Sequence, residues 1–229
     1  MEDEAELGKL LRRAAEKQRG YAGFFSWPDK GVAEWGVAAL FADAATAANE
    51  PGFPLRSLTS REPGRDPPDC EAVDADGRRV AIEVTELVDP LAIEEARRSR
   101  APESVISLWD RDRFLCRLTE LVRGKDGKAL HDRPYNEYYV LVHTDESDLS
   151  ADAVRGWLSG HEFLPLGQAT RAYLLLSYDP HLRGCPLFRL QCGAAQRGVA
   201  AAESQGRPCP PAKAVIRDRQ TRLEGSQLL

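Results

Sequence analysis

The alternation of hydrophobic and polar positions along the chain predicts a succession of helices and strands. A helix is expected where apolar residues recur every three or four positions, and a strand where apolar and polar residues alternate. The predicted helices are residues 2–19, 31–48, 104–123 and 151–158, the last with Ser150 as a candidate N-cap. The predicted strands are residues 53–60, 69–74, 78–87, 137–143, 172–178 and 187–191. Residues 88–103 are charged and are expected to form a loop or an irregular helix.

This order predicts an α/β (α+β) fold. Because strands occur both in a hairpin and separated by helices, a mixed β-sheet flanked by helices fits best. The length of 229 residues and the hydrophobic content of 42% indicate one sizeable packed domain. We expect an N-terminal helical segment over residues 1–30, the domain itself over 31–192, and a C-terminal tail over 193–229 whose weak apolar pattern is compatible with disorder.

Composition argues against several classes of protein. No apolar stretch approaches the ~18 residues that span a bilayer, so no membrane partner is expected. The acidic N-terminus lacks the apolar region of a secretory signal, and the five cysteines form no C-x-x-C pair, so we expect a cytoplasmic protein with reduced thiols. The formal net charge of −5 argues against a polycation that coats nucleic acid. A nucleic-acid function would therefore depend on a local site.

The clearest candidate for chemistry is a pair of carboxylates in the predicted hairpin. Residues 75–77 form a three-residue loop with Gly77 where a positive φ is favoured, so the numbers of opposed residues add up to 152. Asp69 then lies opposite Glu83, and opposed Cβ atoms in an antiparallel pair are about 4.5–5.5 Å apart. Two carboxylates at this distance repel each other unless a cation lies between them or one is protonated. Their hard oxygen atoms suit Mg²⁺, with Mn²⁺ as an alternative.

These residues resemble a known family. Pro68-Asp69 followed by Glu83-Val84-Thr85 on the next strand is similar to the motif of the PD-(D/E)xK nuclease superfamily. The resemblance covers residues 31–145, and extends to 191 if the later strands enlarge the sheet. It implies a restriction-endonuclease-like core in which a helix precedes a three-stranded meander, followed by a helix and another strand.

The resemblance also implies a function. It predicts a metal-dependent nuclease that hydrolyses phosphodiester bonds with water activated by Mg²⁺, on nucleic acid, with DNA favoured over RNA. Asp69, Glu83 and the backbone of Val84 would hold the metal, and Glu34 would be an accessory acidic residue. The alternative for Glu34 is an exposed helix charge, which the sequence favours slightly over the accessory role. Many nucleases of this fold act as homodimers, which the sequence neither supports nor excludes.

One position departs from the family pattern. The usual lysine falls two residues after the glutamate, where this chain has Thr85, and a hydroxyl cannot supply a fixed positive charge. Some members carry this lysine on the following helix instead. Lys125 is then the first candidate and Lys128 the second, while Thr85 either holds water or is simply a β-forming residue.

Basic residues around the hairpin are candidate contacts for a phosphate backbone. They are Arg61, Arg65, Arg79 and Lys128. As scattered surface charges they need no function. Two other functions remain open: a catalytically inactive nuclease-fold protein that binds nucleic acid or protein, which the Thr85 departure favours, and an unrelated α+β interaction domain. Because acidic residues outnumber basic ones over residues 61–100, a nuclease with this sequence would bind its substrate in a metal-dependent way.

Overall fold

The computed structural model describes most of the predicted domain and little of either end of the chain. The described residues are 21–22, 29–61, 67–98, 105–131, 134–177, 184–193 and 213–216. The helices are α2 (Lys30–Ala47), α3 (Pro90–Arg98), α4 (Arg111–Asp126) and α5 (Ala151–Leu158). The strands are β1 (Arg56–Ser60), β2 (Cys70–Val73), β3 (Arg79–Glu86), β4 (Val105–Leu108), β5 (Glu137–Thr144), β6 (Arg171–Leu176), β7 (Leu187–Arg189) and β8 (Lys213–Ile216). The predicted helix over residues 2–19 lies outside the described residues.

Six strands form one mixed sheet in the order β1-β2-β3-β5-β6-β7. β1, β2 and β3 are an antiparallel meander, β3, β5 and β6 run parallel to one another, and β7 returns antiparallel to β6. The predicted mixed sheet flanked by helices is therefore confirmed. The hairpin pairs Cys70 with Ile82, so its predicted register is confirmed as well.

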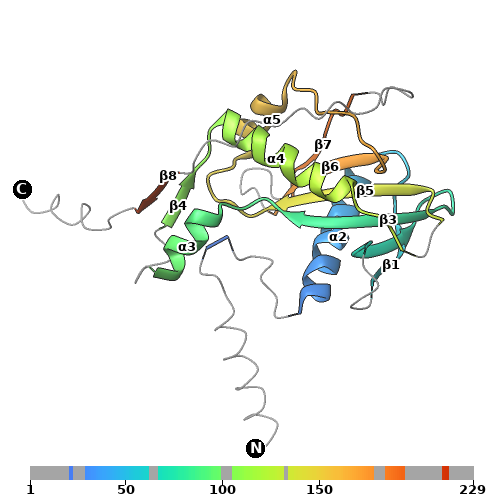
Figure 1. Ribbon diagram of the computed structural model, residues 1–229. Coiled ribbons are helices and arrows are strands. Elements are labelled where there is room, and N and C mark those ends of the chain that lie inside the picture. The colour runs from blue at the N-terminus through green and yellow to red at the C-terminus, as the bar shows by residue number, and fades with distance from the viewer. Residues whose placement is uncertain are drawn as a thin grey trace, which may run out of the picture.

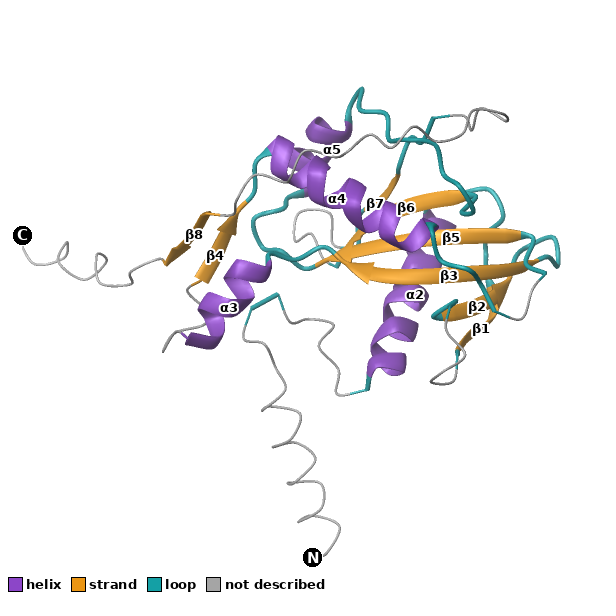
Figure 2. Ribbon diagram, viewed as in Figure 1, coloured by secondary structure: helices purple, strands orange, loops and turns teal. Residues whose placement is uncertain are grey.

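Helices cover both faces of this sheet (Figures 1 and 2). Because side chains alternate along a strand, β3 contributes to both sides. Val80 and Ile82 pack with Phe41 of α2 on one face, whereas Ala81 packs with Phe114 and Leu118 of α4 on the other. α5 lies on the same face as α4. Glu83 is two positions after Ala81 on β3, so its side chain also lies on the α4 face of the sheet.

The prediction of one helix over residues 104–123 is wrong at its start. Residues 105–108 form β4, which pairs antiparallel with β8, and the helix begins only at Arg111. The Asp110 side chain caps α4 by accepting a hydrogen bond from the Arg113 backbone N–H. The stretch 88–103, predicted as a loop or irregular helix, contains the regular helix α3. Four residues of the predicted C-terminal tail form β8; the others after residue 193 lie outside the described part.

Two further expectations can be compared with the structure. Cys70, Cys185 and Cys192 are free thiols, but Cys116 is disulfide-bonded, so the expectation of reduced thiols is wrong for Cys116. Within the described ranges, none of the helices has the length and apolar character to cross a bilayer.

A buried polar cluster joins the ends of several elements at the carboxyl ends of β3 and β5. Asp89 forms an ion pair of 2.8 Å with Arg113 of α4, and its backbone N–H donates to Glu146 at 2.7 Å. The Tyr21 hydroxyl donates to the other oxygen of Glu146. Burial is the largest effect on this carboxyl group and raises the pKa of Glu146 to about 7. The cluster anchors the start of α4 and the segment around Tyr21.

Candidate functional site

Asp69 and Glu83 lie on neighbouring strands with their side chains buried on the α4 face of the sheet. Asp69 directly precedes β2, Glu83 is in the middle of β3, and their fractional exposures are 2% and 0%. The Cys70–Ile82 pairing next to them places the two residues opposite each other, as the hairpin arithmetic predicts. Buried carboxylates are rare unless they are paired, so the neighbours of this pair define the site.

A lysine from α4 lies between the two carboxylates. Nζ of Lys125 is 2.6 Å from Oε2 of Glu83 and 3.1 Å from Oδ2 of Asp69. Burial opposes the charged form of this lysine, but the attraction of Asp69 and the hydrogen bond to Glu83 outweigh it, and the pKa of Lys125 is raised. Lys125 is therefore a fixed cation at neutral pH, and it occupies the place that sequence reasoning assigned to it.

The last turn of α4 is held in place from both sides of Lys125. The Tyr138 hydroxyl of β5 donates to the Lys125 carbonyl oxygen at 2.7 Å. The Asp126 carboxylate accepts three backbone N–H groups, from residues 167–169, at 2.6, 2.9 and 2.7 Å. These contacts fix a helix end that glycines at 124 and 127 would otherwise weaken. The direction of the Lys125 side chain is thus set by its backbone.

In each carboxylate one oxygen atom accepts hydrogen bonds and the other has no hydrogen-bond partner among the described residues. Oδ2 of Asp69 accepts the Val84 backbone N–H at 2.8 Å in addition to Lys125. Oδ1 of Asp69 and Oε1 of Glu83 are buried without a hydrogen-bond partner among the residues that the structure describes. Buried polar atoms nearly always have a partner, and a buried anionic oxygen without one is costly. The two oxygen atoms are therefore suited to a ligand that carries positive charge.

Two more lysines and a third carboxylate border the pair. Nζ of Lys128, just beyond α4, is 3.2 Å from Oε2 of Glu83. Nζ of Lys30, at the first turn of α2, is 3.0 Å from Oε1 of Glu34 and 3.8 Å from Oδ1 of Asp69. Burial and the charge of Asp69 together raise the pKa of Glu34. The Glu34 side chain is mostly buried, so the alternative prediction that Glu34 is an exposed helix charge is wrong.

Lys30 is the member of this group that sequence reasoning missed. Its spacing of four residues before Glu34 is a signal in the sequence, because residues i and i+4 share one face of a helix. The carboxylates also affect Cys70, whose pKa is raised to about 12 by burial and by Asp69, Glu34 and Glu83. This thiol is therefore not a nucleophile.

The donor set fits a hard divalent cation that keeps several waters. In the described part of the chain, no group of three or more His, Cys, Asp or Glu side chains is placed to hold a metal. Glu34 therefore does not complete a three-carboxylate cluster with Asp69 and Glu83. Mg²⁺ is commonly bound by one or two carboxylates together with water and substrate phosphate, so a pair of carboxylates is compatible with such an ion.

Three of the remaining predicted residues, Thr85, Arg61 and Arg79, lie on the strands β1 to β3 or directly next to them. Thr85 is half-buried on the same face as Glu83 and is paired with Val142 of β5. Arg61 and Arg79 both form ion pairs with Glu71, at 3.4 and 2.9 Å, so part of their charge is already compensated. Arg65 lies outside the described residues.

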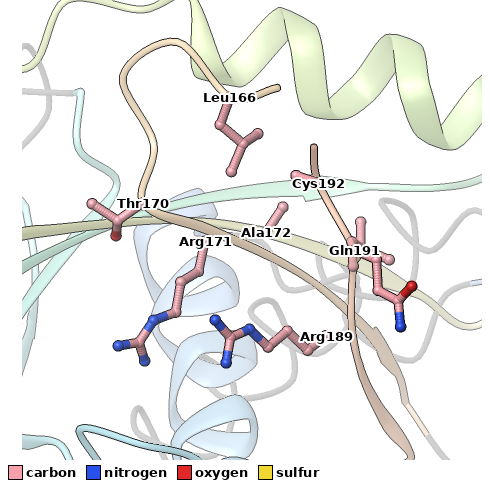
Figure 3. Close-up of a pocket in the computed structure, with 8 residues that line it drawn as sticks. Leu166, Thr170, Arg171, Ala172, Arg189, Gln191 and Cys192 are labelled. Carbon is pink, nitrogen blue, oxygen red and sulfur yellow. The ribbon is translucent and has the colours of Figure 1, made fainter. Parts of the chain in front are cut away.

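A separate pocket of about 420 Å³ opens beside β6 and β7 (Figure 3). It is lined by Leu166, Thr170, Arg171, Ala172, Arg189, Leu190, Gln191 and Cys192. In Figure 3 the side chains of Arg171 and Arg189 lie below Leu166 in the view. Acidic neighbours lie at 3.9 Å from Arg171 and 3.8 Å from Arg189, in Glu137 and Glu50 respectively. The pocket shares no residue with the carboxylate–lysine site.

Comparison with known proteins adds no assignment: no family model, no curated protein and no solved structure matches the chain. The chemistry of the site must therefore be argued from its own residues.

Proposed function

We propose that the protein is a metal-dependent nuclease with a restriction-endonuclease-like core, acting on nucleic acid and preferably DNA. One observation carries this proposal: Lys125 bridges Asp69 and Glu83, two buried carboxylates on adjacent strands. The topology supports it, because the meander β1-β2-β3 is preceded by α2 and followed by helices and the parallel strand β5. The resemblance to PD-(D/E)xK nucleases implies a helix, a meander, a helix and a strand, and α3 and β4 are additions to that order before α4.

In this proposal Asp69 and Glu83 would hold Mg²⁺, with the backbone of Val84 as a further ligand. When bound, Mg²⁺ supplies Lewis-acid chemistry, since it makes water more acidic and stabilises negative charge on a phosphate. The Val84 N–H orients Asp69 through its Oδ2 atom, 2.8 Å away, so that Oδ1 is left for the metal.

Lys125 supplies the fixed positive charge that Thr85 cannot. Its raised pKa keeps its proton in place at neutral pH, so it stabilises negative charge on the reacting phosphate rather than accepting a proton. Glu34 has a raised pKa and can hold a proton close to the site. It is the accessory acidic residue of the proposal.

A binding module with the same fold and without catalysis is the second candidate. The observation that favours it is that lysines form ion pairs with both carboxylates, as in a structural ion-pair network. Such a protein would bind nucleic acid in a salt-dependent way without cutting it.

Cleavage assays separate the two functions. Purified protein is incubated with plasmid, linear duplex and single-stranded substrates in Mg²⁺ or Mn²⁺, alongside Asp69→Asn and Glu83→Gln. We expect metal-dependent cleavage by the wild-type protein and none by either variant. Asp152→Asn, which changes an exposed carboxylate on α5, is the matched control and should cut normally. Cleavage that persists in Asp69→Asn and Glu83→Gln would disprove the site, and binding without cleavage by the wild-type protein would favour the binding module.

A further inference from the structure

We infer that Lys30 and Lys128 change their ion-pair partners when the metal binds. Before that, their ammonium groups compensate the carboxylates; afterwards they pair with phosphates of the substrate. The inference rests on the proposed function and adds that metal and nucleic acid bind interdependently.

The charges of the site balance without a metal. Glu34, Asp69 and Glu83 contribute −3 when all three are ionised, and the three lysines at 30, 125 and 128 contribute +3; a proton on Glu34 makes the sum more positive. A divalent ion would bring the sum to at least +2 in a partly buried site, where like charges repel more strongly than in water. Metal binding is therefore opposed until positive charge leaves or negative charge arrives.

The three lysines differ in how firmly they are held. Lys125 is only 16% exposed, contacts both central carboxylates, and belongs to a helix end that is anchored on two sides. Lys128 is 41% exposed and Lys30 is 73% exposed, and each lies at the rim of the site. The carboxylates that they contact are buried and need a cation, but the two ammonium groups themselves reach solvent. They can therefore move into solvent at small cost once a metal compensates the carboxylates. Lys125 cannot.

The two exposed lysines approach the carboxylates from different helices. Lys30 begins α2 and Lys128 follows α4, and these helices cover opposite faces of the sheet (Figure 2). A phosphodiester backbone carries one negative charge per phosphate, and a lysine ammonium binds phosphate as a point charge. A strand lying across the site would therefore meet one ammonium on either side of the metal. Its phosphates would replace the carboxylates as partners of Lys30 and Lys128.

The first experiment measures, by titration calorimetry, the affinity of the full chain for Mn²⁺ without nucleic acid. Because a competing cation is removed, we expect Lys128→Met and Lys30→Met each to bind Mn²⁺ about 3- to 10-fold more tightly than the wild-type protein, and the double variant more tightly still. Lys128→Arg keeps the charge and should behave as the wild-type protein does. Arg123→Met, an exposed change in the last turn of α4, is the control.

The second measurement repeats the titration with a short phosphorothioate DNA duplex. The duplex should raise the Mn²⁺ affinity of the wild-type protein, and this enhancement should shrink in the double variant. If the wild-type protein binds Mn²⁺ but Lys30→Met and Lys128→Met leave the affinity unchanged or lower it, the inference is overturned while the proposed function stands. If neither the wild-type protein nor the double variant binds Mn²⁺, both are overturned. Binding by the double variant alone would support the inference.

Discussion

Nζ of Lys125 lies 2.6 Å from Oε2 of Glu83, although 42 residues separate the two in the chain. The contact joins the end of α4 to the middle of the sheet, and it brings an ammonium group to a carboxylate that solvent does not reach. Charge-assisted hydrogen bonds of this length are among the stronger ones in proteins. The relationship explains how the site can contain a lysine although the motif position after Glu83 is a threonine.

Replacing Lys125 by methionine should abolish most of the cleavage activity. Loss of one preorganised positive group at a reacting centre costs roughly 10²–10³ in rate, so we expect a decrease of that size in single-turnover cleavage. Arg123→Met tests whether any charge lost from the end of α4 has the same effect. Equal rates for Lys125→Met and the wild-type protein would remove the lysine from the mechanism.

A lysine at the position that the PD-(D/E)xK motif gives it should partly rescue that variant. Thr85 has its side chain on the same face as Glu83, two positions further along β3, so a lysine there can reach toward the carboxylates. We expect Lys125→Met/Thr85→Lys to recover a measurable part of the lost cleavage rate. Thr85→Met in the same background is the control, and rescue by methionine as well as lysine would rule out the explanation by charge.

Substitution of Asp126 should lower the cleavage rate and leave metal affinity nearly unchanged. Its carboxylate holds three backbone N–H groups next to Lys125 and touches neither Asp69 nor Glu83 in the described contacts. Asp126→Ala should lower the rate about 10-fold, since a small misplacement of a catalytic group is costly, while Mn²⁺ affinity stays within about 2-fold of the wild-type value. Asp126→Asn, which keeps one acceptor oxygen, should be intermediate. A parallel loss of metal affinity would contradict a role in positioning Lys125.

Glu146 should make the protein less stable as the pH rises from about 4.5 to 7. Its pKa is raised by burial to about 7, so over this range the folded protein holds a proton that the unfolded chain has released. The unfolding free energy then falls with increasing pH, by about 3 kcal/mol in total for a shift of this size, and levels off above the folded pKa.

The test is urea unfolding of the wild-type protein and of Glu146→Gln between pH 5 and 8. The variant cannot ionise at this position, so the decline should be much smaller in Glu146→Gln. Glu120→Gln changes a half-exposed glutamate on α4 and should leave the pH dependence as it is. An unchanged slope in Glu146→Gln would show that another group titrates.

The site was more predictable from sequence than the fold around it, for physical reasons. Asp69 and Glu83 face each other because a three-residue loop fixes the register of a hairpin, which is a local relationship. Lys125 follows from helical spacing and from the family resemblance. Lys30 escaped notice because its contact with Asp69 depends on how α2 lies on the sheet, which no local pattern reveals.

The strand β4, in contrast, could not be predicted from the sequence. Residues 105–108 precede a strongly helical pattern, and helical spacing alone extends that pattern backward over them. Asp110 is a good N-cap residue and could have marked the true start of the helix. The strand itself depends on pairing with β8, more than a hundred residues later in the chain, and such distant pairing cannot be read from a window of sequence.

The pairing of β4 with β8 has a consequence for shortened forms of the protein. Among the described strands, β8 is the only partner of β4. A chain that ends before Lys213 would leave the backbone N–H and C=O groups of β4 unpaired, close to α3 and the start of α4. An open strand edge of this kind is a template for pairing with a second molecule. Trimming the apparently dispensable end would therefore favour self-association rather than a cleaner monomer.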